Sequence, residues 1–529
     1  MPPSAPHPEV PPHTPVLAGV GEASERIGEP GYQRRSPADL AAAAALAAVA
    51  DTGADPGAVT AAIGTVAGVR QFEISVPGVS SPLGRSSNYP RSVAARIGAR
   101  PGRAILEVSG GQSPQHLVSD MAAAIAAGAA GTVLITGSEA LSSIARYALA
   151  AGDPGSTDRP DFTEDPGGSL EDRGYGPTGM GPPHYAAHGL SSAARQYAVI
   201  ENARRARLGL TRGQYAAAMG ALFAPFTEVA AANPHAAART VRGATELITP
   251  TEANRPVADP YTRYIVAREK VNQGAAVLLM PAGTARRLGV PRDRWVFLHG
   301  HADVAERDLL ERRDLSAGPA SVLAARHALE VAGIGADALA TIDLYSCFPA
   351  PVFNICEGLG LATDDPRGLT VTGGLPFFGG PGNNYSMHAI AETVRRARAA
   401  PGSYGFVGAN GGVMSKYSAA VYSTAPAPWR PCRSARLQAR IDGWPAPAQA
   451  RRADGWARIE ACTVAPRRDG SLAGVVIGSL AADGRRFVAR SHDHDEDMLA
   501  LLSAGEPVGA RVHVSSSGPG NRVTIRPGS

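Results

Sequence analysis

The chain has 529 residues, which is too long for one ordinary hydrophobic core and predicts roughly three domain-sized units. Its 51 lysine and arginine residues against 47 aspartate and glutamate residues give a formal net charge of +4. Because no long basic run is present, the charge gives little reason to expect nucleic acid as the main ligand. The four cysteines lack the close paired spacing of zinc sites and are too few for a disulfide scaffold, which favours a reducing, cytoplasmic location.

The first 14 residues are rich in proline and predict a disordered N-terminus over residues 1–14. They contain no basic segment followed by an apolar core, and no run of about 18 uninterrupted apolar residues occurs in the chain. We therefore expect neither a secretion signal nor a membrane segment.

Residues 15–255 predict a first α/β unit. Pro15–Gly21 is typical of a buried strand, and an alanine-rich helix follows it. Strands predicted at Arg103–Val108 and Gly131–Thr136 flank a helix from Gln115 to Ala127. Apolar strands joined by helices indicate an α/β layer with a parallel sheet.

Within this unit, residues 151–253 are predicted to form an insertion. From Asp153 to Pro183 the sequence is rich in Gly, Pro, Asp and Ser and has no periodic apolar pattern. Helical patterns resume over Leu190–Leu208 and Arg212–Phe223. We expect surface loops and a few helices here.

Residues 256–424 predict a second unit on the same plan. Its expected elements, in order, are strands at Gly274–Met280 and Trp295–His299, a helix over Ala320–Ala332, a strand at Thr341–Tyr345, and a hairpin of Ser403–Gly408 with Ser418–Ser423. A proline-rich linker over 425–434 then leads to short alternating strands within 435–529, which predict a small β-barrel similar to the oligonucleotide-binding fold.

The densest glycine segment of the chain is Gly373–Asn384, which runs directly into a helical pattern. Glycine lets the backbone approach a ligand closely, as binding of an oxyanion or a phosphate by amide groups requires. The segment predicts a loop that holds an anionic group at a helix entrance.

These segments resemble the thiolase superfamily over approximately Pro15–Ser423. The sterol-carrier-protein-type lineage is indicated by the order of the following short motifs: Ala194–Tyr197, Asn233–Ala236, Asn254–Pro256, Asp259–Tyr261 and Val271–Val277. With the added C-terminal domain, the chain is most similar to the actinobacterial thiolase-like proteins type 1, often labelled acetyl-CoA acetyltransferases. The resemblance implies an α/β fold of αβαβα layers made from two similar halves, with a loop-domain insertion and a C-terminal small β-barrel domain.

The thiolase nucleophile is a cysteine at a helix N-terminus, where the helix dipole favours the thiolate. Alignment of the following helix places Gly111 at that position, so no thiolate is available there. Ser113 is a candidate substitute nucleophile and a candidate for binding CoA. A serine directly before Pro114 is also typical of a helix N-cap, and we favour capping.

The second thiolase motif corresponds to Tyr345–Phe348 in this chain. Related thiolase-fold aldolases have a tyrosine at the first position, so Tyr345 is a candidate proton donor or acceptor, with a buried structural tyrosine as the alternative. Ser346 is a further candidate for a catalytic residue. Cys347 is a candidate nucleophile, although a small buried thiol with a packing role is the favoured interpretation.

The third and fourth motifs have also changed. Gly379, Gly380 and Pro381 match the family's Gly-His-Pro and imply CoA binding, but the histidine is absent. Asn383 offers an amide donor for a carbonyl oxygen, as does Asn384, and one of the two is expected to cap the helix. The second catalytic cysteine is replaced by Ala409, which leaves Asn410 as a catalytic candidate and Gly411 as a CoA-binding candidate.

The remaining polar candidates are histidines and an acidic turn. His184 is a candidate for acid–base work and for binding CoA, with a loop-packing role favoured for it and for His188, His299 and His301. The segment Ser491–Asp497 is dense in potential metal ligands, but its spacing favours a solvated turn over a metal site.

The resemblance implies a protein that acts on acyl-CoA thioesters by acyl transfer with unusual catalytic residues. An aldolase-like carbon–carbon lyase and a non-catalytic acyl-CoA-binding scaffold are the alternatives. CoA thioester is the only ligand expected, with no separate cofactor. A homodimer, or a partner protein bound through the C-terminal domain, remain open; neither a nucleic acid nor a membrane is expected as a partner.

Overall fold

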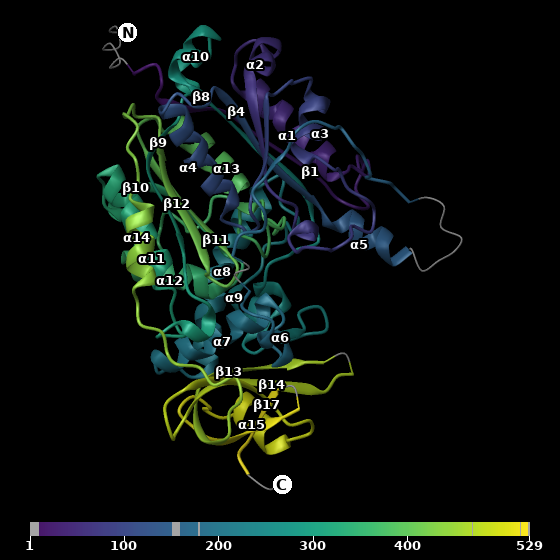
Figure 1. Cartoon of the computed structure of the whole chain (residues 1–529), viewed down its shortest axis with the longest axis vertical. Helices are drawn as coiled ribbons and strands as arrows, with labels where there is room; N and C mark the ends of the chain where they lie inside the picture. Colours follow the sequence, from purple (N-terminus) through teal and green to yellow (C-terminus); the bar gives the residue numbers. More distant parts are fainter. Residues whose placement is uncertain (1–9, 151–158, 178–179, 468, 519, 527–529) are drawn as a thin grey trace.

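Two β-sheets with helices between and outside them form the larger part of the protein (Figure 1). The structure is a computed structural model that describes residues 10–150, 159–177, 180–467, 469–518 and 520–526. Of the stretch expected to be disordered, residues 1–9 lie outside this description. Val10 is buried, and its carbonyl accepts a hydrogen bond from Arg286, so the chain is already ordered before the first strand.

The first sheet has six strands in the order β1-β8-β4-β2-β3-β5. Their bounds are Pro15–Glu25 for β1, Ile63–Gly68 for β2, Arg103–Leu106 for β3, Thr132–Ala140 for β4, Glu171–Asp172 for β5 and Asn272–Pro281 for β8. β8 lies antiparallel between β1 and β4, so the expectations that it starts the second sheet and that the sheet is purely parallel are wrong. A run of apolar residues shows that a strand is buried on both faces, but it does not show which sheet it joins.

The second sheet has four strands in the order β10-β11-β12-β9. The bounds are Phe297–Ala305 for β9, Leu339–Leu344 for β10, Tyr404–Gly411 for β11 and Lys416–Ser423 for β12. The predicted hairpin of β11 and β12 is confirmed, with Asn410 opposite Tyr417. Both strands are almost completely buried because helices cover the two faces of this sheet.

Helices form three layers around the two sheets. α4 (Ser113–Ala126) and α13 (Tyr385–Ala399) contact each other and both sheets, so they form the central layer. α1 (Pro37–Asp51), begun by a capping box of Ser36 and Asp39, covers the first sheet, while α11 (Pro319–Ala332) covers the second. The expected αβαβα layers are therefore present. The other helices of the two halves are α2 (Pro56–Ala62), α3 (Tyr89–Ile97), α5 (Leu141–Ala150), α10 (Ala282–Arg287) and α12 (Pro349–Leu359).

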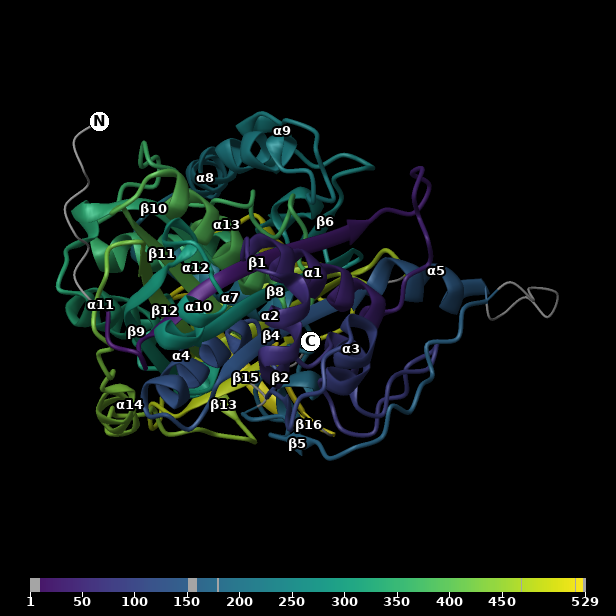
Figure 2. The ribbon, with the colours of Figure 1, turned by 90° about the horizontal axis from the view of Figure 1, so that it is seen from above.

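The predicted insertion contains α6 (His184–Ala187), α7 (Ala193–Arg207), α8 (Arg212–Ala232) and α9 (Ala244–Ile248), followed by the short strands β6 (Pro256–Ala258) and β7 (Tyr261–Thr262). α8 and α9 lie side by side (Figure 2). Among the described residues, α8 is the one helix long and apolar enough to span a membrane. Its large side chains, including Phe223 and Phe226, belong to the main hydrophobic core.

The C-terminal region is a closed five-stranded barrel that lies beneath α6 and α7 (Figure 1). α14 (Ser434–Asp442) precedes it, and its elements are β13 (Gly455–Pro466), β14 (Leu472–Leu480), β15 (Arg486–Ser491), α15 (Glu496–Ser503), β16 (Arg511–Ser517) and β17 (Gly520–Thr524). The barrel has a small core of its own, but Ala461, Ile477 and Val488 join the main core. The buried amide of Asn202 donates hydrogen bonds to the carbonyls of Asp259 and Cys462, which joins α7 to β13. The barrel is therefore packed firmly against the insertion.

Candidate functional site

The glycine loop needs its glycines at particular positions. Gly373, Gly374, Gly379 and Gly382 all have positive φ, a conformation that side chains with a Cβ rarely adopt. Gly380 differs, because its φ is not positive and a Cβ there would have no neighbour nearer than 3.5 Å. The position at which thiolases have a histidine therefore still has room for a side chain.

The space at Gly111, the position that aligns with the thiolase nucleophile, is occupied by groups from other segments of the chain. Gly111 lies just before α4, and a Cβ on it would collide with the phenolic oxygen of Tyr345 and lie 2.5 Å from the carbonyl oxygen of Asn410. Tyr345 follows β10 and is 7% exposed. Burial raises the pKa of its phenol well above the usual value, so the group stays protonated. A tyrosine thus occupies the space of the missing cysteine side chain.

The side chain of Gln112 occupies the adjoining space, next to Gly411. A Cβ on Gly411 would collide with its Oε1 atom, which is buried and has no hydrogen-bond partner among the described residues. Gln112, and not Ser113, is the residue at the N-cap of α4. The capping role predicted for Ser113 is wrong, because its hydroxyl donates to the carbonyl of Val108 at 2.7 Å instead of accepting from the helix.

The side chains of Cys347 and Asn410 lie close to each other in the same region. The amide of Asn410 donates to the hydroxyl of Tyr197 at 2.7 Å and lies 3.9 Å from the sulfur of Cys347. Burial raises the pKa of the Cys347 thiol to about 12, so this thiol is a poor source of thiolate. The Oδ1 atom of Asn410 is buried without a hydrogen-bond partner in the described chain, so it can still accept one.

Three other candidates hold the glycine loop in place. The hydroxyl of Ser346 accepts a hydrogen bond from the amide of Leu375 at 3.2 Å. Asn383 donates to the carbonyl of Arg70 and to the hydroxyl of Ser75, while Asn384 donates to the carbonyl of Gly137. Asn384 stands at the N-cap of α13 but makes no side-chain capping bond, so the expected cap is wrong. Pro381 contributes its carbonyl to the amide of Asn384.

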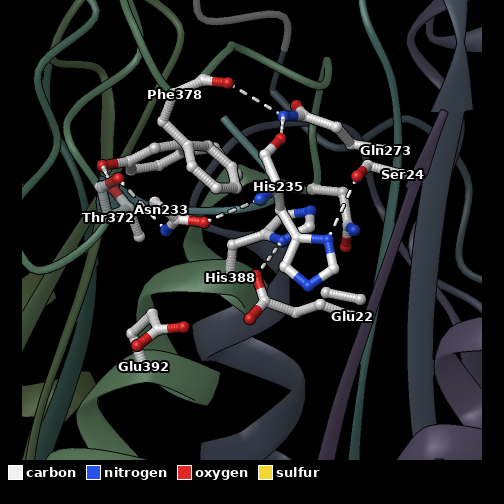
Figure 3. A network of polar contacts seen from close by, with 12 residues as sticks. Glu22, Ser24, Asn233, His235, Gln273, Thr372, Phe378, His388 and Glu392 are labelled. Carbon is white, nitrogen blue, oxygen red and sulfur yellow. Dashed lines mark hydrogen bonds and ion pairs between the residues drawn. The ribbon is translucent and has the colours of Figure 1, made fainter. Parts of the chain in front are cut away.

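A buried network ties the loop to the first sheet (Figure 3). The Nδ1 atom of His388 lies 2.5 Å from a carboxylate oxygen of Glu22, and both side chains are fully buried. Burial alone would raise the pKa of Glu22, but the hydrogen bond and charge of His388, with Arg395, lower it to about 2. Gln273 donates to the carbonyls of His235 and Phe378. These contacts fix α13 and the glycine loop relative to β1 and β8.

A basic cavity of about 400 Å³ lies beside Gly380. Gly380 donates its amide to the carbonyl of Arg268, which lines this cavity. The other charged or aromatic lining residues are Arg242, Arg255, Arg263, Tyr264, Glu269, Lys270 and Phe377. The Nε atom of Arg268 is buried and makes no hydrogen bond to any described residue. Arg242 is paired with Glu246, which leaves four cationic side chains against the carboxylate of Glu269 and favours an anionic ligand in this cavity.

The remaining predicted residues lie elsewhere. His184 is the first residue of α6, and its ring packs edge-on against that of Tyr185, with the ring centroids 4.9 Å apart. It lies near the barrel and does not line the cavity. Burial lowers its pKa. Among the described residues no group of three or more His, Cys, Asp or Glu side chains is arranged to hold a metal ion.

The sequence did not reveal Gln112 or the cavity arginines as site residues. Gln112 carries no motif, and its role depends on the absence of a side chain at Gly411. Three basic residues, Arg263, Arg268 and Lys270, follow soon after the Asn254–Pro256 motif, and this spacing was a signal that could have indicated the cavity.

Comparisons with known proteins agree with this geometry. A family model described as "Thiolase-like protein type 1 additional C-terminal domain" matches residues 436–519. A solved structure of a monomeric SCP2-thiolase like protein type 1 from Mycobacterium smegmatis is 49% identical, over 98% of this chain and 100% of that chain, with a TM-score of 0.83. No curated protein matches the chain.

Two more distant structures share the fold. The Ltp2-ChsH2(DUF35) aldolase is 20% identical, with 78% of this chain and 98% of that chain covered and a TM-score of 0.55. The acetyl-CoA acetyltransferase from Syntrophomonas wolfei is 15% identical, with 78% of this chain and 99% of that chain covered and a TM-score of 0.52.

The two layered halves, together with the solved structures that share them, define a protein of the thiolase fold. Within that class, the chain belongs to the SCP2-thiolase-like proteins type 1.

Proposed function

We propose that this protein binds a CoA thioester, with the phosphates of CoA in the basic cavity and the thioester at the glycine loop. The observation that carries this proposal is Arg268, whose buried Nε atom has no partner among the described residues and whose carbonyl accepts the amide of Gly380. A buried guanidinium N–H without a partner is costly, and a bound phosphate would satisfy it.

The bound thioester would not be transferred to a cysteine of the enzyme. The two positions that carry thiolase cysteines are Gly111 and Ala409, and burial holds the pKa of Cys347 at about 12. Acyl transfer through an enzyme thioester needs a thiolate at the substrate carbonyl. The proposed function is therefore binding without covalent thiolysis, and the CoA thioester is the only ligand that the proposal requires.

A carbon–carbon lyase acting on the bound CoA ester is the second candidate. It is favoured by the phenol of Tyr345, which stands where the nucleophile would be and makes no hydrogen bond to any described residue. Since burial raises its pKa, the phenol would act as a proton donor to the carbanion released on cleavage.

As to assembly, we propose a cytoplasmic monomer. The 49% identical protein is described as monomeric, and in this chain β5 covers part of the edge of β3. The name of the aldolase structure joins Ltp2 to ChsH2(DUF35), and this pairing is a precedent for binding of a partner protein.

The binding proposal is tested by calorimetric titration of the protein with CoA and acetyl-CoA. Arg268→Gln is expected to weaken binding at least about tenfold, because a hydrogen bond to a charged group contributes about 1.5–3 kcal/mol. Arg103→Gln, which removes an exposed guanidinium paired with Glu171, is the matched control and should bind normally. Equal affinity of wild type and Arg268→Gln would refute the proposed cavity.

Turnover separates the two candidates. Incubation with acyl-CoA substrates, followed by assays for free thiol and for carbon–carbon cleavage, should give no product if the protein only binds. Cleavage that is lost in Tyr345→Phe and retained in Cys347→Ala would establish the lyase instead.

A further inference from the structure

A second basic site lies far from any residue of the cavity, where the barrel meets the insertion. It consists of Arg195 of α7, Arg490 of β15, Arg522 of β17, and Arg467, which follows β13; this set is called the seam arginines below. All four side chains are half-buried. None of them lines the cavity beside Gly380.

The seam arginines converge in space. A Cβ on Gly189 would lie 3.8 Å from Nη1 of Arg195 and 3.8 Å from Cδ of Arg490, so these two side chains flank one point. Arg490 and Arg522 are direct neighbours on the parallel strands β15 and β17. Like charges directly opposite each other on adjacent strands destabilise a sheet. The fold therefore keeps an unfavourable arrangement here.

The carboxylates around the cluster do not balance its charge. Asp493 forms an ion pair with Arg467, and the charges of Arg467, Arg490 and Arg522 all lower its pKa, but its side chain is 64% exposed and supplies one negative charge to four arginines. Arg490 makes no side-chain hydrogen bond or ion pair to any described residue, and Arg195 donates only to the carbonyl of Gly189. Among the described residues, Arg522 donates to the carbonyl of the neighbouring Asn521 and to no other group. Burial lowers the pKa of Arg195, and the charges of Arg490 and Arg467 lower it further.

The surroundings of the cluster are rigid. His188 has Nδ1 2.7 Å from the carbonyl of His184, and its Nε2 accepts a hydrogen bond from the amide of Asn521. The imidazole is therefore neutral and joins α6 to β17 beside Arg522. Because both elements are held, the guanidinium groups cannot separate by movement of the barrel.

We propose that the seam arginines form a binding site for a phosphorylated small molecule, held between the barrel and α7. Guanidinium groups bind phosphate oxygens through paired N–H donors, and four of them around a single exposed carboxylate match a ligand that carries two or more negative charges. A compact ligand is favoured over an extended acidic partner, because the groups are half-buried and converge instead of lying along an open face.

Inorganic pyrophosphate is the probe for this site. The thermal midpoint of the full-length protein is measured with pyrophosphate and with sodium chloride at equal ionic strength. We expect the rise in the midpoint caused by pyrophosphate to be smaller in Arg490→Gln/Arg522→Gln than in the wild type, and this difference to persist when both proteins also carry Arg268→Gln, which alters the cavity beside Gly380. The matched control is Arg458→Gln/Arg485→Gln, which removes two exposed arginines of the same barrel and should keep the shift.

Without pyrophosphate, the seam variant is expected to be at least as stable as the wild type, since a repulsive pair has been removed. Its affinity for CoA should be unchanged, so failure of this proposal and failure of the CoA proposal are distinguishable. If the double variant has no cooperative unfolding transition, the single variant Arg195→Gln replaces it with the same expectation.

An equal pyrophosphate shift in the wild type and the seam variant would overturn the proposal. So would tighter binding of a twelve-residue oligothymidylate or a poly-glutamate peptide than of pyrophosphate, when that binding is lost in the seam variant. These results would assign the arginines to a nucleic acid or to an acidic protein.

Discussion

The phenolic oxygen of Tyr345 stands in the space that a Cβ on Gly111 would occupy. The two residues come from different halves of the fold: Gly111 lies just before the central helix α4, and Tyr345 directly follows β10. The loss of a side chain at one position and the presence of a large one at the other are therefore physically coupled.

This coupling predicts that Gly111→Ala destabilises the wild type by about 1–3 kcal/mol, because an added methyl group overpacks a filled site. In a Tyr345→Ala background the same change should cost much less. Urea unfolding of the four proteins measures the coupling. Gly131→Ala, at a position with no neighbour within 4 Å, is the control and should be nearly neutral. Purely additive effects would show that the two residues do not compete for space.

The carboxyl of Glu139 predicts a decline of stability as the pH rises from 4.5 to about 8. Burial raises its pKa from 4.5 to about 8, beside Gly382 of the glycine loop. The folded state therefore retains a proton that the unfolded chain has lost, so this contribution is complete below pH 4.5 and is lost as the pH rises to about 8. Glu139→Gln should remove this pH dependence of the unfolding free energy, which amounts to on the order of a few kcal/mol over the range. Parallel pH profiles of wild type and variant would contradict the prediction.

The pair of Glu22 and His388 predicts the opposite dependence at acid pH. The folded-state pKa of Glu22 is about 2, so its contribution is complete above 4.5 and is lost as the pH falls to about 2. Glu22→Gln should cost about 3–5 kcal/mol at neutral pH, because it breaks a buried, charged contact. Glu330→Gln changes a similar carboxylate–histidine contact whose carboxylate is exposed, and its unfolding midpoint should stay at the wild-type value. A similar loss in both variants would mean that burial of the pair is unimportant.

The amide of Asn202 predicts that the barrel and the insertion unfold together. Asn202→Ala leaves the buried carbonyl of Cys462 without this donor and should cost about 1–3 kcal/mol. Unfolding followed by the combined fluorescence of the four tryptophans, which include Trp456 in the barrel and Trp295 in the core beside the first sheet, and by circular dichroism should give a single transition for wild type and for variant. Gln438→Ala, which removes an amide that bonds near the surface, is the control. Two separate transitions in the wild type would contradict the firm packing of the barrel.

Local patterns predicted much of the fold. Strand β4, helix α11, the hairpin of β11 and β12 and the C-terminal barrel all lie where apolar periodicity and turn residues indicate. The sequence pattern assigned β8 to the second sheet, whereas it belongs to the first. Pairing between strands that are distant in the sequence depends on which hydrophobic faces meet in the fold. The capping predictions were also wrong: Ser113 and Asn384 have suitable side chains, but Ser113 donates to the nearby carbonyl of Val108 and Asn384 to the carbonyl of Gly137, which is distant in the sequence.

For the candidate site, the sequence by itself determined which chemistry is missing, because Gly111, Gly380 and Ala409 have no side chain that can transfer a proton. Only the tertiary structure decided what became of the three positions. Gly111 is blocked by Tyr345, Gly380 retains open space beside the basic cavity, and Ala409 is buried in β11. Residue identity limits reactivity locally, whereas the occupation of space depends on side chains that the fold brings together from distant segments.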